Sequence, residues 1–369
     1  MQNDMGKTVP DPASSRYHRQ LILPGIGQEG QERIARARVL VVGAGALGAA
    51  VMLYLVPAGI GSIGIIDHGE VDESNLPRQV LYATSDLDRP KVVAAKDRLQ
   101  AMNPDVTVEP HFKRLNAENA AGIIQRYDLV IECSDYLPTK LLVNDACVML
   151  QKPCIIGAAL MYEGQLSVYN YEDGPTYRCL VPEAPDPLTL PTCENSGVMG
   201  MIPGVIGNLQ AMEAIKIITG TGNVMKGRML HFDGLNGSFM ELPIEVNPEN
   251  KQVTALSEYE LSCPDDLIGQ YLVEPYAFFE VMEKEGPFEV VALSDDQEEL
   301  CIKNYRWEAI PLHRLPDRIR DIPVNHKLML VCENGNKNVE GLKYLLMREN
   351  FTRVYALRYG LSALRFLNL

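Results

Sequence analysis

The 369-residue sequence is short of positive charge. It has 34 lysines and arginines against 48 aspartates and glutamates, so its formal net charge is −14. This balance argues against nucleic acid or an anionic membrane surface as a main partner, because both would repel the chain. The first sixteen residues, MQNDMGKTVPDPASSR, lack the apolar core of a signal peptide. Internal repeats and low-complexity tracts are absent as well.

The sequence also lacks a disulfide framework. Its eight cysteines are scattered through a long chain, at positions 133, 147, 154, 179, 193, 263, 301 and 332. We therefore expect a cytoplasmic protein with free thiols. Hydrophobic residues at 46% and charged residues at 22% are typical of a soluble globular protein, and the length suffices for two domains.

One uncharged run has the length of a transmembrane helix. It extends over 28 residues, from Val39 to Ile66. Six glycines and Pro57 interrupt it. The pattern is better explained as a strand, a turn, a helix and a second strand, all buried in a parallel sheet.

The first two thirds of the chain alternate between expected strands and helices, which predicts an α/β fold with a doubly wound, mostly parallel sheet. The expected strands cover residues 38–42, 62–66, 106–111, 127–132, 154–159 and 165–169. The expected helices cover residues 46–58, 90–102, 116–125 and about 137–149. A proline-rich loop follows over 177–196, then apolar residues at helical spacing from 198 to 219, and a hairpin of 228–233 with 238–242.

Composition turns polar after this hairpin, which divides the chain. We expect a first domain over 10–246, a linker over 247–268 and a small α/β domain over 269–369. The last domain shows helical patterns at 275–284 and 338–349, strand patterns at 288–292, 327–332 and 353–357, and a closing helix.

The motif VVGAGALG, Val41 to Gly48, follows a strand and opens a helix. Gly43, Gly45 and Gly48 have the spacing of a loop that cradles phosphate at a helix N-terminus. Asp67 ends the next strand, where a carboxylate accepts hydrogen bonds from ribose hydroxyls. Both a nicotinamide cofactor and ATP satisfy these features, so an oxidoreductase and an activating enzyme remain open at this point.

Downstream polar residues favour ATP. Asn75, Arg78, Gln79 and Lys91 should gather near the phosphate end of the sheet, and two cations with two amides suit a triphosphate better than a nicotinamide ring. Asp135 follows the fourth strand, and a carboxylate beside phosphates normally binds Mg²⁺.

Several motifs together resemble the MoeB/ThiF family, the ubiquitin-activating-enzyme-like adenylyltransferases of sulfur carrier proteins. They cover residues 10–245 and read RYHRQ, LPGIGQEGQ, GAGALG, DESNLPRQ, RPK, YRCLVPE, PTCENSGVMG and PGVIGNLQAMEAIK. The resemblance implies a Rossmann-like sheet of the ThiF type and the use of ATP and Mg²⁺. In the implied reaction, the C-terminal Gly-Gly carboxylate of a small ubiquitin-fold carrier attacks the α-phosphorus of ATP.

The resemblance also implies roles for individual residues. Asp67 would hold the ribose, Asn75, Arg78, Gln79 and Lys91 the phosphates, and Asp135 the magnesium. Arg19, in RYHRQ, would reach the ATP of a neighbouring protomer, which predicts an obligatory homodimer. Three positions depart from the family pattern, since Tyr136 replaces an asparagine, Lys140 an arginine, and Ala46 a residue that is often glycine.

Two cysteines are candidate reactive thiols. Cys193 lies just before a helix, where amides favour the thiolate, and in the family the matching cysteine is proposed to link covalently to the carrier. Cys332 begins the loop CENGNK between a strand and a helix, which resembles the active loop of rhodanese domains and could stabilise a persulfide. The resemblance therefore implies a rhodanese-like second domain, with sulfurtransferase activity left open.

We expect no structural zinc. Family members commonly carry two CxxC pairs. Here Thr176 replaces the partner of Cys179, and Asp266 the partner of Cys263, so the ligand set is incomplete.

Three functions remain to be compared. The first is an ATP-dependent activating enzyme for a sulfur carrier in a molybdopterin, thiamine or related pathway, with a cysteine desulfurase as a possible sulfur donor. The second is an inactive protein that only docks a carrier. The third, an oxidoreductase, is disfavoured by DESNLPRQ at 72–79.

Overall fold

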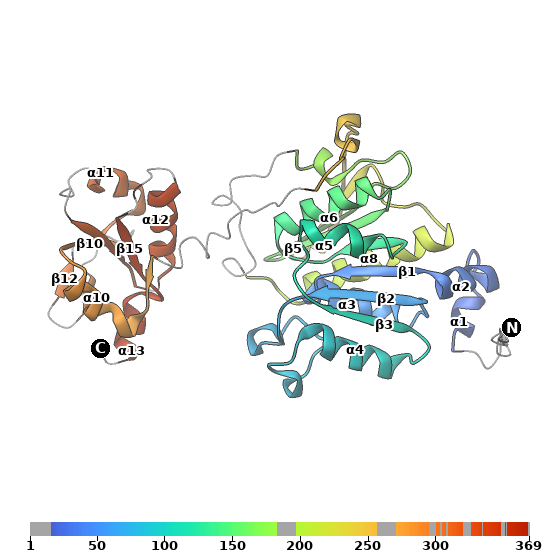
Figure 1. Ribbon diagram of the computed structural model, residues 1–369, viewed down its shortest axis with the longest axis horizontal. Helices are drawn as coiled ribbons and strands as arrows, with labels where there is room; N and C mark the ends of the chain where they lie inside the picture. Colours follow the sequence, from blue (N-terminus) through green and yellow to red (C-terminus); the bar gives the residue numbers. More distant parts are fainter. Residues whose placement is uncertain are drawn as a thin grey trace. The chain divides into compact units, whose positions relative to one another are not determined.

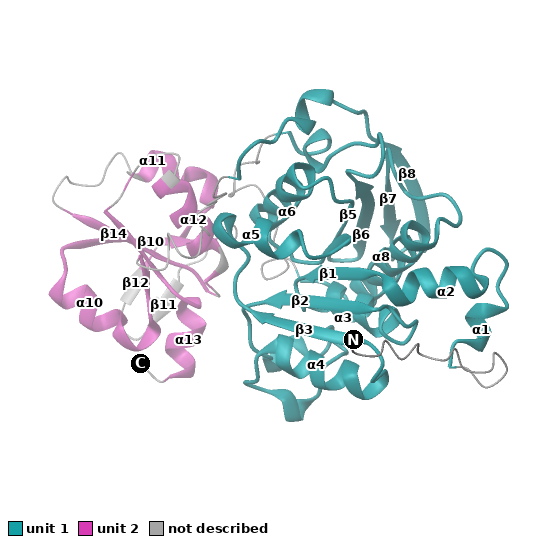
Figure 2. Ribbon diagram, turned by 45° about the vertical axis from the view of Figure 1, so that its right-hand side comes forward, with its two compact units in different colours: residues 1–185, 191–259 teal, residues 186–190, 260–369 magenta. Residues whose placement is uncertain are grey.

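The computed structural model describes residues 16–182, 197–256, 271–294, 300–302, 305–307, 309–319, 326–333, 335–347, 351 and 353–367. These residues form two compact units (Figure 2), the first up to residue 256 and the second from residue 271. Cys193, Cys263 and Asp266 lie outside the described residues.

An eight-stranded sheet organises the first unit (Figure 1), with strand order β3-β2-β1-β4-β5-β6-β7-β8. The first five strands are parallel and the last three add antiparallel neighbours. The predicted doubly wound, mostly parallel sheet is thereby confirmed. The strands are β1 (Arg38–Val42), β2 (Ser62–Asp67), β3 (Thr107–Phe112), β4 (Leu129–Glu132), β5 (Cys154–Leu160), β6 (Glu163–Tyr169), β7 (Arg228–Asp233) and β8 (Ser238–Pro243).

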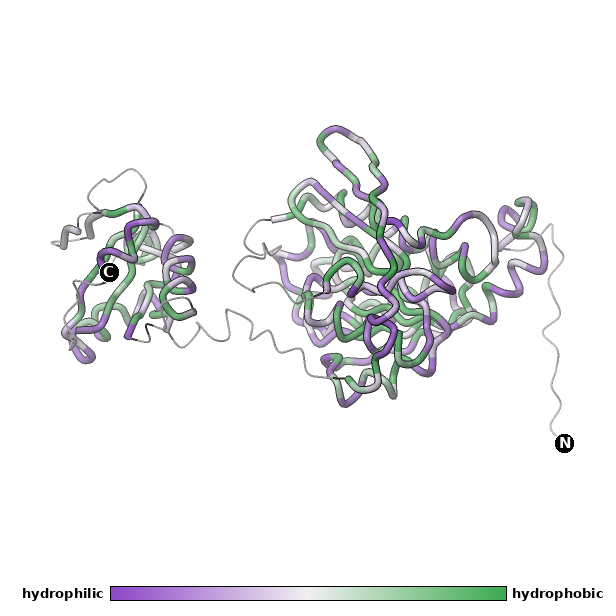
Figure 3. The backbone as a smooth tube through the Cα atoms, turned by 90° about the horizontal axis from the view of Figure 1, so that it is seen from above, coloured by the Kyte–Doolittle hydropathy of each residue, from purple (hydrophilic) through white to green (hydrophobic). Residues whose placement is uncertain are grey.

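Helices cover both faces of this sheet. One face packs against α3 (Ala46–Leu55), α4 (Lys91–Met102) and α8 (Met201–Thr219), and the other against α5 (Ala117–Ile124) and α6 (Leu137–Met149). The uncharged run 39–66 is thus β1, α3 and β2, as predicted. Figure 3 shows hydrophobic stretches running through the interior of this unit. No helix among the described residues is long and apolar enough to cross a membrane.

Some boundaries differ from the predicted ones. The helix expected from residue 198 begins at Met201, because Val198 instead forms a bridge with Met161. Two helices precede β1, α1 (His18–Leu21) and α2 (Gly27–Arg36). Short 3-10 helices connect the other elements: η1 (Glu73–Asn75), η2 (Thr84–Asp86), η3 (Tyr177–Cys179) and η4 (Pro248–Lys251).

The second unit has a five-stranded parallel sheet of order β13-β10-β14-β15-β9. Its strands are β9 (Leu272–Val273), β10 (Phe288–Leu293), β13 (Ala309–Ile310), β14 (Lys327–Val331) and β15 (Val354–Leu357), beside a hairpin of β11 (Leu300–Ile302) and β12 (Tyr305–Trp307). Helices α11 (Leu315–Ile319) and α12 (Asn336–Met347) pack on one face, and α10 (Phe278–Lys284) and α13 (Gly360–Phe366) on the other. The segments η5 (Pro275–Ala277) and η6 (Leu312–Arg314) lead into α10 and α11.

Candidate functional site

The glycine loop lies at the carboxyl end of β1. It is tightly packed at Gly43 and Gly48 and open at Gly45. Gly43 has φ +94°, and a Cβ added to it would lie 2.9 Å from the backbone nitrogen of Ser134. A Cβ on Gly48 would lie 2.1 Å from the carbonyl oxygen of Gly43. A Cβ on Gly45 would meet only the Gln79 amide nitrogen, at 3.8 Å. The space beside Gly45, at the N-terminus of α3, is therefore open to an anion, which the first amides of the helix would bind.

Asp67 connects β2 to this loop. Its Oδ2 accepts the Ala44 amide at 2.7 Å and its Oδ1 accepts the Gly69 amide at 2.7 Å. The buried Tyr82 hydroxyl donates to the Ala44 carbonyl at 2.7 Å, which holds the loop from the other side. Each carboxylate oxygen of Asp67 can accept a further hydrogen bond, as from a ribose hydroxyl.

The predicted phosphate ligands lie on the segments that follow Asp67, and Gln79 among them borders Gly45. Lys91 begins α4, and its backbone N–H donates to the carbonyl of Gly69, two residues after Asp67, at 3.0 Å. The Gln79 Nε2 donates to Asn75 Oδ1 at 2.5 Å, and Arg78 Nη1 donates to the Ser74 carbonyl at 2.8 Å.

The side chain of Gln79 is buried with one polar atom unpaired among the described residues. Its side chain is 4% exposed, and its Oε1 has no hydrogen-bond partner among the described residues. A buried acceptor without a partner costs about 1–3 kcal/mol. A ligand hydroxyl, a water or a hydrated cation beside the glycine loop would remove that cost, so the residues present fit a nucleotide.

Asp135 is placed to act as a metal ligand. It is exposed, follows the Ser134 that packs on Gly43, and has no hydrogen bond or ion pair within the described part of the chain. No group of three or more His, Cys, Asp or Glu side chains that could hold a metal ion occurs among the described residues. Mg²⁺ commonly binds one or two carboxylates together with substrate phosphates, so a single carboxylate beside a phosphate loop fits this ion.

A buried ion pair lies directly beneath the Asp135 loop. Lys140 and Glu132 are 5% and 0% exposed and bonded to each other, and Lys140 Nζ also donates to the carbonyls of Ser134 at 2.7 Å and Gly157 at 2.8 Å. Burial alone would lower the pKa of Lys140, but the Glu132 charge raises it above its ordinary value. Sequence reasoning missed this pair. The available signal was a glutamate that ends an apolar strand and a lysine within an apolar helix.

Two of the departures from the family pattern, Lys140 and Tyr136, have contacts in the structure. Lys140, in place of arginine, makes the buried bonds above. Tyr136, in place of asparagine, lies under the Arg114 guanidinium, 5.6 Å from its ring centroid.

Arg19 does not lie with the other predicted site residues. It is exposed on α1, and the neighbouring Tyr17 packs on Gly59 and accepts a hydrogen bond from Asn103 at 2.9 Å. Gly59 and Asn103 precede β2 and β3, whereas the glycine loop follows β1. In Figure 1 the strands run away from α1. Because a six-residue strand spans about 20 Å, Arg19 lies at the amino ends of the parallel strands, whereas the glycine loop of the same chain lies at their carboxyl ends.

Hydrogen bonds and one ion pair hold the segment around Cys179. The Arg178 guanidinium donates two bonds of 2.8 Å to Asp145 on α6, and Asn144 Oδ1 accepts the Tyr177 amide at 2.6 Å. The Cys179 sulfur accepts the Asn247 amide at 3.3 Å. Partial burial raises the pKa of this thiol, but the bonds from Asn247 and from neighbouring side chains outweigh it and lower the pKa. Cys133, Cys147 and Cys154 are buried, in agreement with a structural role.

Cys332 directly follows β14 in the second unit and is 1% exposed. Its sulfur accepts the Gly335 amide at 3.1 Å, so a backbone N–H of the loop does point at the sulfur as predicted. Glu333, the next residue, would place a negative charge beside a thiolate, but it forms an ion pair with Arg365 on α13.

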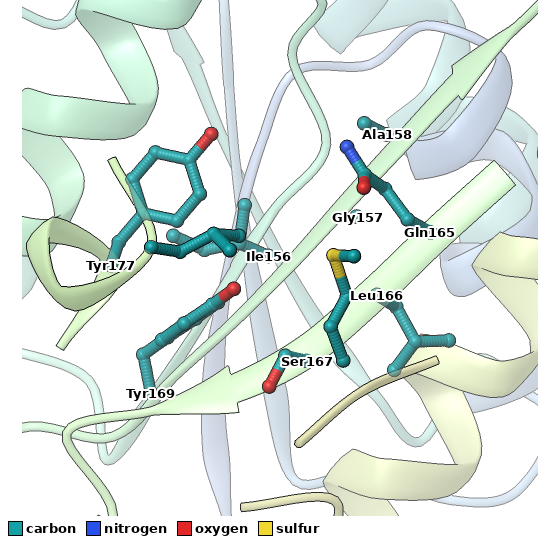
Figure 4. Close-up of a pocket in the computed structure, with 10 residues that line it drawn as sticks. Ile156, Gly157, Ala158, Gln165, Leu166, Ser167, Tyr169 and Tyr177 are labelled. Carbon is teal, nitrogen blue, oxygen red and sulfur yellow. The ribbon is translucent and has the colours of Figure 1, made fainter. Parts of the chain in front are cut away.

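A separate pocket lies between β5, β6 and η3 (Figure 4), with an empty volume of about 220 Å³ that includes open solvent. Figure 4 shows the rings of Tyr169 and Tyr177 on one side and Gln165 on the other. None of the predicted nucleotide ligands lines it. The candidate nucleotide site is the glycine loop instead, where Gln79 borders the open space at Gly45.

Comparison with known proteins agrees with this geometry. A model of the ThiF family matches residues 17–255. The chain belongs to the ThiF family. One relative, a sulfur carrier protein adenylyltransferase of Thermus thermophilus, is 47% identical over 259 residues, which are 67% of this chain and 96% of that protein. The adenylyltransferase and sulfurtransferase MOCS3 of Culex quinquefasciatus is 47% identical over 256 residues, and the match covers 68% of this chain but only 58% of that protein.

Solved structures share the fold of the ThiF region. The E. coli MccB structure with ATP has a TM-score of 0.55 and 20% identity, and covers 66% of this chain and 73% of that one. The Microcin C7 biosynthetic enzyme MccB in complex with N-formylated MccA has a TM-score of 0.57 at 20% identity, with coverages of 65% and 75%. At this identity the likeness establishes the fold alone.

Proposed function

We propose that the protein adenylates the C-terminal Gly-Gly carboxylate of a small ubiquitin-fold sulfur carrier with ATP. The observation that carries the proposal is the unpartnered Oε1 of Gln79, whose side chain borders the open space at Gly45 in the loop that Asp67 holds through the Ala44 amide. The relatives named as sulfur carrier protein adenylyltransferases support the substrate. An inactive docking protein would not need to keep a buried acceptor unpartnered.

The chemistry requires positioning and charge neutralisation more than a protein nucleophile. The carrier carboxylate is already ionised at neutral pH, so no general base is needed. One of its oxygens bonds to the α-phosphorus, the bond from that phosphorus to the bridging oxygen breaks, and pyrophosphate leaves with the electron pair. Arg78, Lys91 and the amides at the start of α3 hold the phosphates and offset the charge on the leaving group. Mg²⁺ held by Asp135 would neutralise further phosphate charge.

We infer that a homodimer completes the site. Arg19 lies at the edge of the sheet opposite its own glycine loop, so only the Arg19 of a second copy could contact this ATP. Without the Arg19 guanidinium of a second copy, only Arg78, Lys91 and the metal would neutralise the triphosphate.

The later sulfur step is assigned to the second unit, which we propose to be rhodanese-like. Cys332 has the amide contact that a persulfide anion needs, and Arg365 offsets the charge of Glu333. Incubation with a sulfur donor such as a cysteine desulfurase should add sulfur to Cys332, visible by mass spectrometry of the tryptic peptide. Cys332→Ala should remove this adduct and leave adenylation unchanged. An adduct at Cys193 alone would instead move the sulfur step, or a covalent link to the carrier, to the first unit.

The adenylation proposal is tested by carrier-dependent ATP–pyrophosphate exchange. Asp135→Asn should lower the exchange rate about a hundredfold or more, as expected for the loss of one electrostatic stabiliser. Asp105→Asn, at an exposed aspartate that precedes β3 at the other edge of the sheet, is the matched control and should exchange normally. A carrier without its Gly-Gly end should give no exchange. Unchanged exchange by Asp135→Asn would refute the role of that carboxylate, and no exchange by the parent protein would favour the docking function.

A further inference from the structure

The end of β4 is fixed by a buried clamp that no part of the proposed chemistry uses directly. The Lys140 ammonium has three N–H donors, and all three are bonded, to Glu132 Oε2, to the Ser134 carbonyl and to the Gly157 carbonyl. These acceptors belong to β4, to the loop after it and to β5. One side chain of α6 therefore ties three segments together.

Ser134 is held at every polar atom it has. Its carbonyl accepts from Lys140 at 2.7 Å, its amide donates to Glu132 Oε1 at 2.9 Å, and its hydroxyl donates to the same oxygen. From the opposite face, Gln210 Nε2 on α8 donates to the Glu132 carbonyl at 2.9 Å.

Asp135 itself has no such support. Its exposed carboxylate makes no hydrogen bond or ion pair within the described residues, so its position depends on the backbone that carries it, which the bonds of Ser134 fix on the N-terminal side. Gly43 of the glycine loop packs on that same backbone. A shift of Ser134 would move Asp135 relative to the phosphate loop.

Stability alone does not account for the buried charges. Removing a lysine and a glutamate from water costs several kcal/mol per ion, and well-packed apolar residues of similar volume are often as stable or more stable. A buried pair in which both side chains bond Ser134 is better explained by the position it gives to the loop after β4.

We propose that Lys140, together with Glu132, is a positioning residue that orients Asp135 as the ligand of the magnesium bound with ATP. This inference rests on the proposed function, since it assumes that Asp135 holds the metal. Neither side chain contacts the nucleotide. Both act through Ser134.

The test compares three variants of the full chain by metal binding without turnover. Mn²⁺ replaces Mg²⁺ and is followed by electron paramagnetic resonance in the presence of a non-hydrolysable ATP analogue. Lys140→Met should raise the Mn²⁺ dissociation constant about tenfold, the lower end of what loss of a ligand-orienting group costs, and should lower the melting temperature because Glu132 is left buried and unpaired. The double variant Glu132→Leu with Lys140→Met buries no unpaired charge, so it should regain most of the lost melting temperature and still bind Mn²⁺ weakly.

Arg178→Met is the matched control. It breaks another buried ion pair of the same unit, with Asp145, and should lower the melting temperature while leaving Mn²⁺ affinity at the parent value. The Mg²⁺ concentration for half-maximal exchange should follow the Mn²⁺ result in each variant, because this midpoint does not depend on the fraction of folded protein.

The outcomes separate the two proposals. Parent-like Mn²⁺ affinity in the double variant would overturn the positioning role and leave adenylation intact. An equal loss of affinity in Arg178→Met would overturn it as well, since general destabilisation would then suffice. A parent protein that binds no Mn²⁺ with the ATP analogue would overturn the assignment of Asp135 and with it this inference.

Discussion

Gly45 and Gly43 lie two residues apart, but substitution by alanine should affect ligand binding at Gly45 and stability at Gly43. Gly45 has φ −79° and ψ −151°, which alanine can adopt, and its added Cβ would touch no protein atom closer than 3.8 Å. Alanine stabilises by about 0.4–1 kcal/mol through the unfolded state, and loses about 0.5–1 kcal/mol at a helix N-cap. These contributions nearly cancel, so Gly45→Ala should shift the melting temperature by no more than about 4 °C.

ATP binding should nevertheless fall in Gly45→Ala. The new methyl group would occupy the space where the amides of α3 meet phosphate, and losing one charge-assisted hydrogen bond costs about 1.5–3 kcal/mol. That is about a ten- to hundredfold rise in Kd for a non-hydrolysable ATP analogue, measured by isothermal titration calorimetry. Gly43→Ala is the contrast. Its φ of +94° costs an alanine about 1–2 kcal/mol before the contact with Ser134 is counted, so this variant should melt several degrees lower. If Gly45→Ala binds the analogue as the parent does, phosphate does not occupy the space at Gly45.

Two further predictions concern the dimer and Cys179. Mixing Arg19→Ala with Asp135→Ala protein should restore part of the exchange activity, because each hybrid dimer would contain one intact composite site; no recovery under proven subunit exchange would count against sharing. Because the hydrogen bonds to its sulfur lower the pKa of Cys179, its thiolate should persist at lower pH than that of a free cysteine, so the midpoint of its iodoacetamide alkylation should lie below that of a free cysteine measured alongside. Asn250→Ala, which removes a bond to the sulfur at 3.6 Å, should raise that midpoint, and a chelator should change neither the midpoint nor the melting temperature; a fall in melting temperature on chelation would reveal a zinc site.

The sheet of the first unit could be predicted because its strands are long apolar runs that alternate with helices. The elements that escaped prediction are short or polar. β9 and β13 have two residues each, too few for any periodicity, and the 10-residue α2 is mostly polar. Val198 fitted a helical repeat in the sequence, but its pairing with Met161 depends on a turn far away in the chain.

Some residues of the candidate site could likewise be predicted from the sequence, and others could not. Gly43, Gly45, Gly48 and Asp67 could be predicted because one continuous strand-loop-helix-strand unit carries them. The Lys140–Glu132 pair could not, since a lysine in a helix ordinarily reaches solvent and its burial depends on β5 packing beside it. Arg19 could be assigned only by resemblance, and its distance from its own glycine loop follows from the direction of β2.

The strand order of the second unit constrains how the chain can fold during synthesis. β9 comes first in this unit yet forms the sheet edge only by pairing with β15, where Ala356 meets Leu272. Its two residues have no other strand neighbour in the described sheet, so they must wait until β15 has left the ribosome. All strands of the first unit lie before residue 244 and can pair earlier. A nascent chain stalled between α12 and β15 should therefore carry a protease-resistant first unit and a protease-sensitive second one.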